Sequence, residues 1–388
     1  MDFSYPPEAA AFREEFRAWL AANLPEGLVG LDWASTELDS DELERMRAWN
    51  RSLAEAGYAA IAWPEEYGGR GAGVMEQVVF AEEMSKADAP GTLNPLGISN
   101  IAPAIMQWGT AEQKRGFLPR MLRGDDIWCQ GFSEPNAGSD LASLRTRAVL
   151  DGDTFIIDGQ KVWNTLGHLA NWCELLVRTD PEVPKHAGIS CLLVDMTLPG
   201  VEVRPLVTIT GEREFNEIFF DDVRVPRDAL LGPLNEGWKV AMTTLAYERG
   251  GVAALHLRVR KKVQRLLELA RTTKVDTGGR TAADVPAVRQ ALARVYLEAE
   301  YLKLLSDRAI SGELHGRPLG PESSLAKLAW SDVENRIAEA AGEVLGPAAN
   351  TGAWGRDRVY VRALSIAGGT TQVNKNIIAQ RVLGLPRS

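Results

Sequence analysis

The hydrophobic residues of this chain change their spacing twice, and that change limits the possible folds more than any other feature. Helical spacing covers about the first 125 residues, strand-like runs fill about 126–232, and helical spacing then returns. The order α, β, α predicts a mainly α protein with a β middle domain, divided into domains 1–125, 126–235 and 236–388. A chain of 388 residues is long enough for three domains.

Helices are predicted at both ends of the chain. Asp39 and Ser40 are candidate caps for one of them, and Thr110 with Gln113 three residues later is typical of a capping box. In the N-terminal domain the helices cover about 8–22, 40–56, 76–87 and 110–122. In the C-terminal domain they cover about 238–272, 286–311, 321–346 and 371–383. The long C-terminal helices predict a bundle.

Short strands with turn signals between them are predicted in the middle domain. Asp151-Gly152 and Asp158-Gly159 are two-residue hairpin signals, and they flank the β-type run 154–157. Further candidate strands cover 189–194, 201–209 and 217–226. Several short strands at this spacing predict a small barrel or sandwich.

Composition excludes several classes of function. A net charge of −9 argues against a nucleic-acid partner, and no apolar run is long enough to span a membrane. No signal peptide is seen, and three cysteines, an odd number, favour a reducing cytoplasm over a disulfide framework. The four histidines are scattered, so we expect no metal site.

The stretch 130–140 carries the strongest local signal for a binding site. Pro135 breaks regular structure, and Asn136, Gly138, Ser139 and Asp140 are turn-forming types. An apolar lead-in therefore ends at a loop rich in free backbone N–H groups, which can bind a phosphate or the edge of a planar ring. The plain alternative is a tight connection between strands.

The chain resembles the acyl-CoA dehydrogenase flavoprotein family over nearly its whole length. Residues 133–140 (Ser-Glu-Pro-Asn-Ala-Gly-Ser-Asp) are similar to the family's Thr or Ser before Glu-Pro, followed by Ala-Gly-Ser-Asp. Residues 159–165 (Gly-Gln-Lys-Val-Trp-Asn-Thr) are similar to its Gly-x-Lys-x-Trp-Ile-Thr. The resemblance implies an N-terminal helical domain, a β-barrel, a C-terminal four-helix bundle, and FAD between the barrel and the bundle.

The resemblance also implies which residues bind the cofactor. Ser133 would hydrogen-bond the flavin ring, Ser139 would approach the phosphates or the pantetheine of the substrate, Trp163 would pack on the flavin, and Thr165 would reach its N5 edge. The plain alternatives are a core aromatic for Trp163 and a strand-end hydroxyl for Thr165. The full set implied is Gln130, Phe132, Ser133, Gly138, Ser139, Trp163, Asn164, Thr165, Gly346, Gly369, Thr370 and Gln372.

The reaction that the family carries out needs a carboxylate that removes the α-proton of a CoA thioester. Many relatives place this glutamate near the C-terminus, where this chain has Gly368. Isovaleryl and long-chain relatives carry it earlier, before an arginine, and Glu248-Arg249 matches that place. The resemblance therefore implies Glu248 as the base, with Ser139, Arg249 and Gly368 facing the substrate. An exposed helix carboxylate is the plain alternative for Glu248.

One departure from the family concerns the far end of FAD. Relatives carry Arg-x-x-Phe-Gly after the first long helix of the bundle, and its arginine holds the FAD pyrophosphate of a neighbouring subunit. The Phe-Gly pair is missing here, and Arg271 or Arg280 is the available substitute. A similar loss occurs in one kind of subunit of heterotetrameric relatives that act on sterol side chains.

The resulting prediction is an FAD-dependent enzyme of fatty-acid β-oxidation type that converts an acyl-CoA to the trans-2-enoyl-CoA. Electrons would pass to an electron-transfer flavoprotein, and the chain would form a homotetramer or a heterotetramer with a related subunit. Gly250 and Gly251 beside the base suggest room for a branched or bulky acyl group. The alternatives are a non-catalytic subunit that completes a partner's FAD site, and a flavin oxidase or monooxygenase on the same fold.

Overall fold

The structure is a computed structural model that describes residues 5–31, 38–248, 252–317 and 320–386, without the side chains of residues 248, 252 and 253. Its contacts form two compact units. The bundle unit contains Met1–Ala10, Val74–Ser85 and Arg249–Ser388, and the sheet unit contains Ala11–Gly73 and Lys86–Glu248. Each unit is described by itself.

The helices predicted in the N-terminal domain are confirmed. They are α1 (Pro7–Asn23), α2 (Ser40–Glu55), α3 (Val74–Lys86) and α5 (Ala111–Arg123), with α3 in the bundle unit. Asp39 and Thr110 both form capping boxes, with Glu42 and Gln113 as their partners. One further helix, α4 (Ala102–Trp108), follows the π-helical turn η4 (Gly97–Ile101) and was not predicted.

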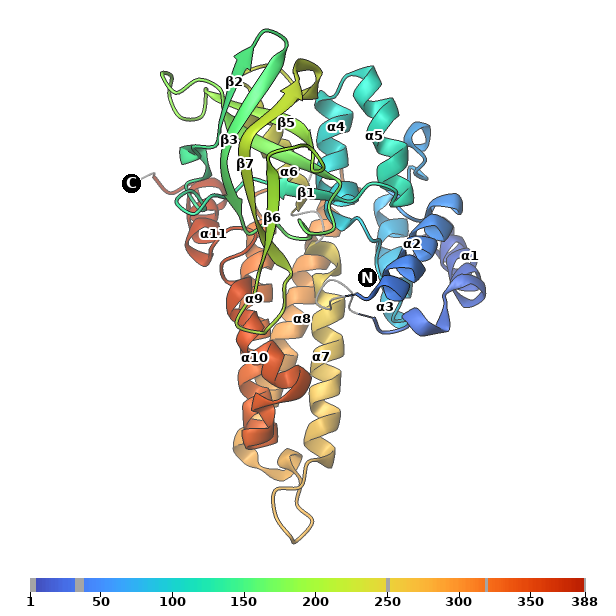
Figure 1. Cartoon of the computed structure of the whole chain (residues 1–388). Coiled ribbons are helices and arrows are strands. Elements are labelled where there is room, and N and C mark those ends of the chain that lie inside the picture. Colours follow the sequence, from blue (N-terminus) through green and yellow to red (C-terminus); the bar gives the residue numbers. More distant parts are fainter. Residues whose placement is uncertain (1–4, 32–37, 249–251, 318–319, 387–388) are drawn as a thin grey trace. The chain divides into compact units, whose positions relative to one another are not determined.

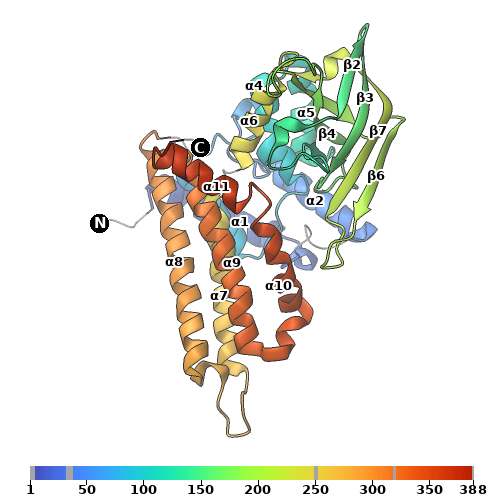
Figure 2. The same cartoon turned by 90° about the vertical axis from the view of Figure 1, so that its left-hand side faces the viewer.

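An eight-stranded sheet forms the middle of the sheet unit (Figures 1 and 2). Its order is β6-β7-β3-β2-β4-β5-β8, and β1 pairs in parallel with β4 outside this path. The strands are β1 (Trp128–Gly131), β2 (Arg147–Asp151), β3 (Thr154–Val162), β4 (Trp172–Arg178), β5 (Ile189–Asp195), β6 (Val201–Leu206), β7 (Phe215–Pro226) and β8 (Leu230–Leu231). Phe155, Leu175 and Leu192 lie in the apolar cluster that packs these strands together.

One of the two predicted hairpin turns is wrong. Asp151-Gly152 does connect β2 to β3, but Asp158-Gly159 lies inside β3, which pairs with β7 on both sides of it. The register shifts between Ile157 and Gly159, which is a β-bulge. Gly159 has φ +152°, and a Cβ there would lie 2.6 Å from Thr146 Cα. The glycine therefore serves a close backbone approach.

The bundle unit contains the long C-terminal helices that the spacing predicted, seen side by side in Figure 2. They are α7 (Val252–Thr272), α8 (Pro286–Leu314) and α9 (Ser323–Leu345). The predicted final segment 371–383 forms the short helix α11 (Thr371–Ile377), followed by the π-helical turn Ile378–Val382. The helix α10 (Gly352–Leu364) was not predicted. The single helix predicted at 238–272 corresponds to α6 (Gly237–Glu248) and α7, and the residues between them lie outside the described part.

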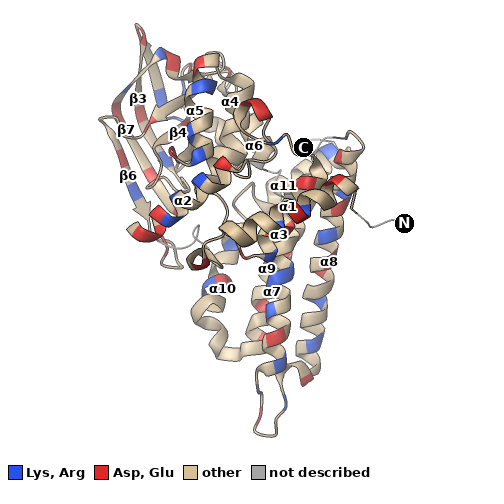
Figure 3. Cartoon of the chain, turned by 90° about the vertical axis from the view of Figure 1, so that its right-hand side faces the viewer, with Lys and Arg blue, Asp and Glu red and all other residues tan. Residues whose placement is uncertain are grey.

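A partly buried ion-pair cluster joins three helices of the bundle. Lys262 on α7 lies 2.9 Å from Glu334 on α9 and 3.1 Å from Asp357 on α10. Burial alone would lower the pKa of Lys262, but the two carboxylates outweigh burial and raise it. Other charged residues occur along the length of α7 and α8 (Figure 3). Within the described residues, no helix is both long and apolar enough to cross a membrane.

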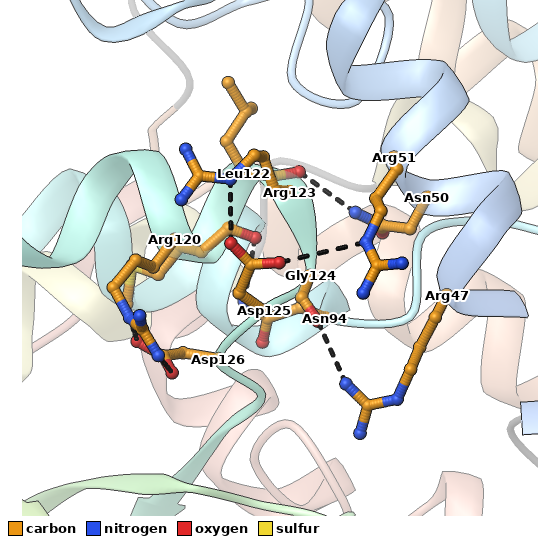
Figure 4. Close-up of polar contacts among 11 residues, drawn as sticks. Arg47, Asn50, Arg51, Asn94, Arg120, Leu122, Arg123, Gly124, Asp125 and Asp126 are labelled. Carbon is orange, nitrogen blue, oxygen red and sulfur yellow. Dashed lines mark hydrogen bonds and ion pairs between the residues drawn. The ribbon is translucent and has the colours of Figure 1, made fainter. Parts of the chain in front are cut away.

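Two buried asparagines hold the end of α5 (Figure 4), and one of them, Asn94, also bonds the start of β1. Asn50 donates to Leu122 O at 3.0 Å, and Asn94 donates to Met121 O at 3.3 Å. These carbonyls belong to the last turn of α5, beyond which the regular helix bonds stop, and Met121 O also accepts from the N–H of the C-cap Gly124 at 3.2 Å. Asn94 Oδ1 also accepts from the N–H of Trp128, the first residue of β1, at 3.0 Å. Asn94 thus sets where the strand before the loop 130–140 begins.

Candidate functional site

The loop after β1 contains a tight turn. The backbones of Glu134 and Ala137 exchange two hydrogen bonds of 3.0 Å across Pro135-Asn136. Ser133 O accepts from the N–H of Val162 at 2.9 Å, which joins this loop to the end of β3. Gly138 and Ser139 follow on the exposed side of the turn, with no atom within 4 Å of a Cβ built on Gly138. The two motifs that carry the resemblance are therefore neighbours in space.

A buried ion pair holds the loop from below. Lys161 Nζ lies 2.9 Å from Glu134 Oε1 and donates to Phe132 O at 3.1 Å. The Lys161 side chain is fully buried, and 9% of the Glu134 side chain is exposed. Glu134 also accepts from the N–H groups of Arg145 at 2.7 Å and Thr146 at 2.8 Å. One carboxylate thus fixes both ends of the segment 134–146.

The pKa values of the two partners follow from burial and pairing. Burial opposes ionisation of Glu134, but the Lys161 ammonium and the hydrogen bonds from Thr146 hold the pKa of Glu134 below its usual range. Burial also lowers the pKa of Lys161, and Glu134 offsets part of that effect. Because Lys161 donates to two oxygens at once, we treat the pair as ionised.

Trp163 lies immediately after β3 in an unusual conformation. Its φ is +64°, a region that residues with a side chain rarely adopt, and 60% of its surface is exposed. Its indole ring meets Phe215 edge to face at 5.7 Å. The alternative of a core aromatic for Trp163 is therefore wrong. An exposed indole held in a strained backbone is typical of a ligand-binding position.

Below Trp163 lies a chain of buried amides. Asn164 Nδ2 donates to Gln130 O at 2.6 Å, and Asn216 Nδ2 donates to Asn164 O at 2.9 Å. Asn164 Oδ1, Gln130 Nε2 and Asn216 Oδ1 are buried and have no hydrogen-bond partner among the described residues. Buried polar atoms normally have a partner, so these three atoms leave room for a water or a bound molecule.

The predicted site residues near the C-terminus belong to the bundle unit. Gly368 and Gly369 have positive φ values of 64° and 86°, and the Thr370 hydroxyl caps α11 by accepting from the N–H of Val373 at 3.1 Å. Lys327 donates to Gly369 O at 2.9 Å. Gln372 is exposed one residue into α11. Gly346, at the end of α9, has φ +58° and lies outside this loop.

The remaining predicted residues are placed only in part. Glu248 ends α6 in the sheet unit, and its side chain is outside the described part of the chain, as is the whole of Arg249. Thr165 is half-buried in the turn that follows Trp163. The structure thus brings Gln130, Phe132, Ser133 and Asn164 together through the contacts above, with Trp163 and Thr165 next to them.

Sequence reasoning assigned no role to three buried charged residues of the sheet unit. Lys161 and Glu134 belong to the two motifs, but the sequence analysis gave them no role. A lysine among apolar strand positions predicts a buried ion-pair partner, and that signal was available. Glu174 interrupts the buried run of β4 and was not considered at all. A lone acid within a buried strand was the available signal.

Comparison with known proteins matches nearly the whole chain to one family, the acyl-CoA dehydrogenases. Models for the N-terminal, middle and C-terminal domains of acyl-CoA dehydrogenases match residues 6–125, 129–223 and 235–383. A relative described as acyl-CoA dehydrogenase IpdE1 of Mycobacterium tuberculosis is 42% identical over 97% of each chain.

Two solved structures superpose on the full length of this chain. A chain of the ChsE4-ChsE5 complex from Mycobacterium tuberculosis is 35% identical, with a TM-score of 0.85 and complete coverage of both chains. A chain of the Tcur3481-Tcur3483 steroid ACAD is 32% identical, with the same TM-score and coverage. These two similar structures both contain two different proteins by name.

Proposed function

The chain belongs to the acyl-CoA dehydrogenase family, and from that premise we propose that it binds FAD and converts an acyl-CoA to the trans-2-enoyl-CoA with Glu248 as the base. The observation that carries this proposal is Trp163, an indole 60% exposed at φ +64° beside the loop of Ser133. We expect the flavin ring to lie against this indole.

The residues present fit a flavin. Trp163 offers an aromatic surface to a planar ring, and Ser133 on the adjoining loop offers a hydroxyl. The backbone N–H groups of Gly138 and Ser139 donate to no other described residue, so they are available to a phosphate or to the pantetheine of CoA. The unpartnered amide atoms of Gln130 and Asn164 supply further polar contacts at the buried side.

The proposed reaction needs three kinds of group: a hydride acceptor, a base for the α-proton, and hydrogen-bond donors to the thioester oxygen. Bound FAD supplies the acceptor for the hydride that leaves the β-carbon. The Glu248 carboxylate would take the proton from the α-carbon, so that the electron pair of the α C–H bond forms the new double bond. Donors at the thioester oxygen, including the backbone N–H near Glu248 or Gly368, would stabilise the charge that develops there.

The test is the variant Glu248→Gln, with Glu236→Gln as the matched control. Glu236 precedes the same helix and pairs with Lys239 on the surface at 2.8 Å. We expect Glu248→Gln to retain FAD but to lose flavin bleaching by acyl-CoA, while Glu236→Gln bleaches normally. Bleaching at the normal rate in Glu248→Gln would disprove the assignment of the base.

The similar structures support a bulky substrate and a mixed assembly. One of them is described as a steroid ACAD, and both are complexes of two proteins. We therefore propose a ring-bearing or branched acyl-CoA as substrate, tested with a panel of acyl-CoAs scored for flavin reduction. Gly250 and Gly251, the sequence evidence for a roomy pocket, lie outside the described residues. A preference for short straight chains would refute this substrate class.

A second candidate is a subunit that completes the FAD site of a related partner. The missing Phe-Gly pair and the two-protein composition of the similar structures favour it. Purifying the chain without a partner distinguishes the two candidates. A yellow oligomer supports the enzyme, whereas a colourless chain that gains flavin only with its partner supports the second candidate. Alanine at Arg271 or Arg280 would then reveal which arginine contributes to flavin retention.

The electron acceptor and the compartment complete the proposal. We propose an electron-transfer flavoprotein as acceptor, and a reducing compartment such as the cytoplasm, in line with three buried free cysteines. Enoyl-CoA formed without hydrogen peroxide supports the dehydrogenase. Oxygen consumption with an acyl-CoA would favour the oxidase or monooxygenase on this fold.

A further inference from the structure

Glu174 is a fully buried carboxyl group inside the sheet unit, on β4. The hydroxyl of Thr244 on α6 donates to Glu174 Oε1 at 2.7 Å. The thiol of Cys191 on β5 lies 4.0 Å from the same oxygen. Glu174 Oε2 has no hydrogen-bond partner among the described residues. Burying a carboxyl group costs free energy, so a fully buried one is expected to have a structural or functional role. The contact of Glu174 with a second element, α6, indicates what that role is.

The contact with Thr244 is accompanied by two further contacts that hold α6 in place. Gly237, at the start of α6, is so close to β5 that a Cβ would collide with the backbone of Ser190 and Cys191. Trp108 Nε1 on α4 donates to Thr243 at 2.9 Å. The hydrogen bond to Glu174 lies nearest to the C-terminal end of α6, where Glu248 stands.

Thr244 and Glu248 are four residues apart on this helix. Positions i and i+4 share one face, so the turn that ends at position 248 is the turn that Thr244 begins. Glu174 is also the register partner of Gln130 across β4 and β1, and Gln130 leads into the loop of Ser133. One residue therefore links the helix of the proposed base, through its carboxyl group, to the strand of the proposed flavin loop, through its backbone.

We propose that Glu174, as a neutral acid, is a positioning residue that anchors α6 through Thr244 and thereby sets the place of position 248 relative to the Ser133 loop. The positioning half of this inference rests on the proposed function. The anchoring half concerns only Glu174, Thr244 and the sheet, and it does not depend on the proposed function.

The surroundings of Glu174 favour the neutral form. Burial raises its pKa to about 8, and the hydrogen bond from Thr244 opposes only part of that rise. Among the described groups, η4 and α4, which pack on α6, contain no titratable residue, and Lys239 of α6 pairs with Glu236 instead. The buried thiols Cys173 and Cys191 are the neighbouring titratable groups. Burial raises the pKa of each, and proximity to Glu174 adds to that rise.

Ionisation of Glu174 would place a charge without a counter-charge between the sheet and α6. In the unfolded chain this carboxyl loses its proton near pH 4.5, and in the folded chain it does so near pH 8. The folded state therefore binds one extra proton between these values, and stability falls as pH rises through that window. One linked proton changes the unfolding equilibrium constant tenfold per pH unit.

The experiment compares wild type with Glu174→Gln, which keeps shape, neutrality and an acceptor for Thr244. Unfolding is measured in urea from pH 5 to 9 on the full-length protein as purified. We expect the unfolding constant of wild type to rise about tenfold per pH unit relative to the variant between about pH 5 and 8. The infrared band of a protonated carboxylic acid at pH 7 should also be lost in the variant. Equal pH slopes and an unchanged band would overturn the proposal.

The positioning half is tested with Thr244→Val, which removes the donor, and Thr244→Ser, which keeps it. We expect Thr244→Val to slow flavin bleaching by saturating acyl-CoA between about ten- and a hundredfold, with little change in substrate affinity, and Thr244→Ser to restore the rate. Wild type should also lose bleaching above about pH 8, and Glu174→Gln should not. A normal rate in Thr244→Val would overturn this half.

The two failures are distinguishable. If Glu248 is not the base, Glu248→Gln still bleaches, yet the difference in pH slope between wild type and Glu174→Gln remains. If Glu174 is not the anchor, the slopes coincide whatever Glu248→Gln does.

Discussion

Lys161 and Glu134 form an ion pair of 2.9 Å in the interior of the sheet unit, directly below the loop that carries Ser133. The same lysine donates to Phe132 O, and the same carboxylate accepts from two backbone N–H groups. The pair therefore links β3 to both ends of the loop. Its first role is to hold the loop in one conformation, which a cofactor ring requires for a defined contact.

Removing one partner of this pair should destabilise the protein strongly. Lys161→Met leaves Glu134 buried without its counter-charge, so we expect a loss of about 3–5 kcal/mol in the free energy of unfolding. The matched control is Glu202→Gln, which breaks an exposed pair with Arg204 and should cost at most about 1 kcal/mol. Urea unfolding measures both. A loss for Lys161→Met as small as that of the control would contradict the structural role.

The same pair predicts a loss of stability in acid. The pKa of Glu134 in the folded chain lies below its usual range, mainly because Lys161 outweighs burial. A carboxyl with a depressed pKa stabilises the fold above its unfolded pKa of about 4.5, and that contribution disappears as pH falls through the folded value. Melting temperatures of wild type should therefore fall below about pH 4.5 more steeply than those of Glu134→Gln. Parallel curves would argue against it.

Trp163 allows binding and stability to be separated. Trp163→Gly removes an indole that is 60% exposed and places glycine at φ +64°, where it is not strained. We expect the free energy of unfolding of the cofactor-free protein to change by less than about 1 kcal/mol, because relief of strain offsets the lost contact with Phe215. Flavin retention through gel filtration should fall sharply, and Trp163→Phe should recover part of it. Full retention in Trp163→Gly would remove Trp163 from the site.

Local features of the fold were predictable because their causes are local. The cap at Asp39 and the capping box of Thr110 with Gln113 were predictable because a cap and its partner are only three residues apart. Asp158-Gly159 misled because its dipeptide also suits a bulge, and only pairing with β7, about 60 residues away, decides between the two. Helix α10 was missed because Gly346-Pro347 was taken as the end of the last long helix.

The site was predictable as motifs and not as contacts. The resemblance identified Ser133 and Trp163 by type and spacing, but no spacing rule reveals that Trp163 is exposed with a positive φ. The hydrogen bond between Glu174 and Thr244 joins residues 70 positions apart, and only the folded sheet brings them together. Glu174 was marked in the sequence merely as an acid within a buried strand.

Asn94 allows a prediction about β1, the strand that leads into the loop 130–140. Asn94→Leu leaves Met121 O and the N–H of Trp128 without their side-chain partner in the interior. We expect a loss of about 2–4 kcal/mol in the free energy of unfolding, because two buried backbone groups lose hydrogen bonds. Arg51→Ala is the control in the same cluster, since Arg51 is half exposed and 3.9 Å from Asp125. It should change stability by less than about 0.5 kcal/mol.

Lys327 makes the corresponding prediction for the bundle unit. Its ammonium donates to Leu364 O at 2.8 Å and Gly369 O at 2.9 Å, and so holds the Gly368-Gly369-Thr370 loop against α9. Gly369 also accepts from Asn374 Nδ2 at 2.8 Å, so the loop keeps one anchor when the lysine is replaced. Lys327→Met should therefore cost about 1.5–3 kcal/mol in the free energy of unfolding and weaken flavin retention without unfolding the bundle. Lys375→Met, at an exposed position on α11, should leave both quantities unchanged. If Lys327→Met retains flavin as wild type does while losing that stability, the loop 368–370 supports the bundle and takes no part in holding the cofactor.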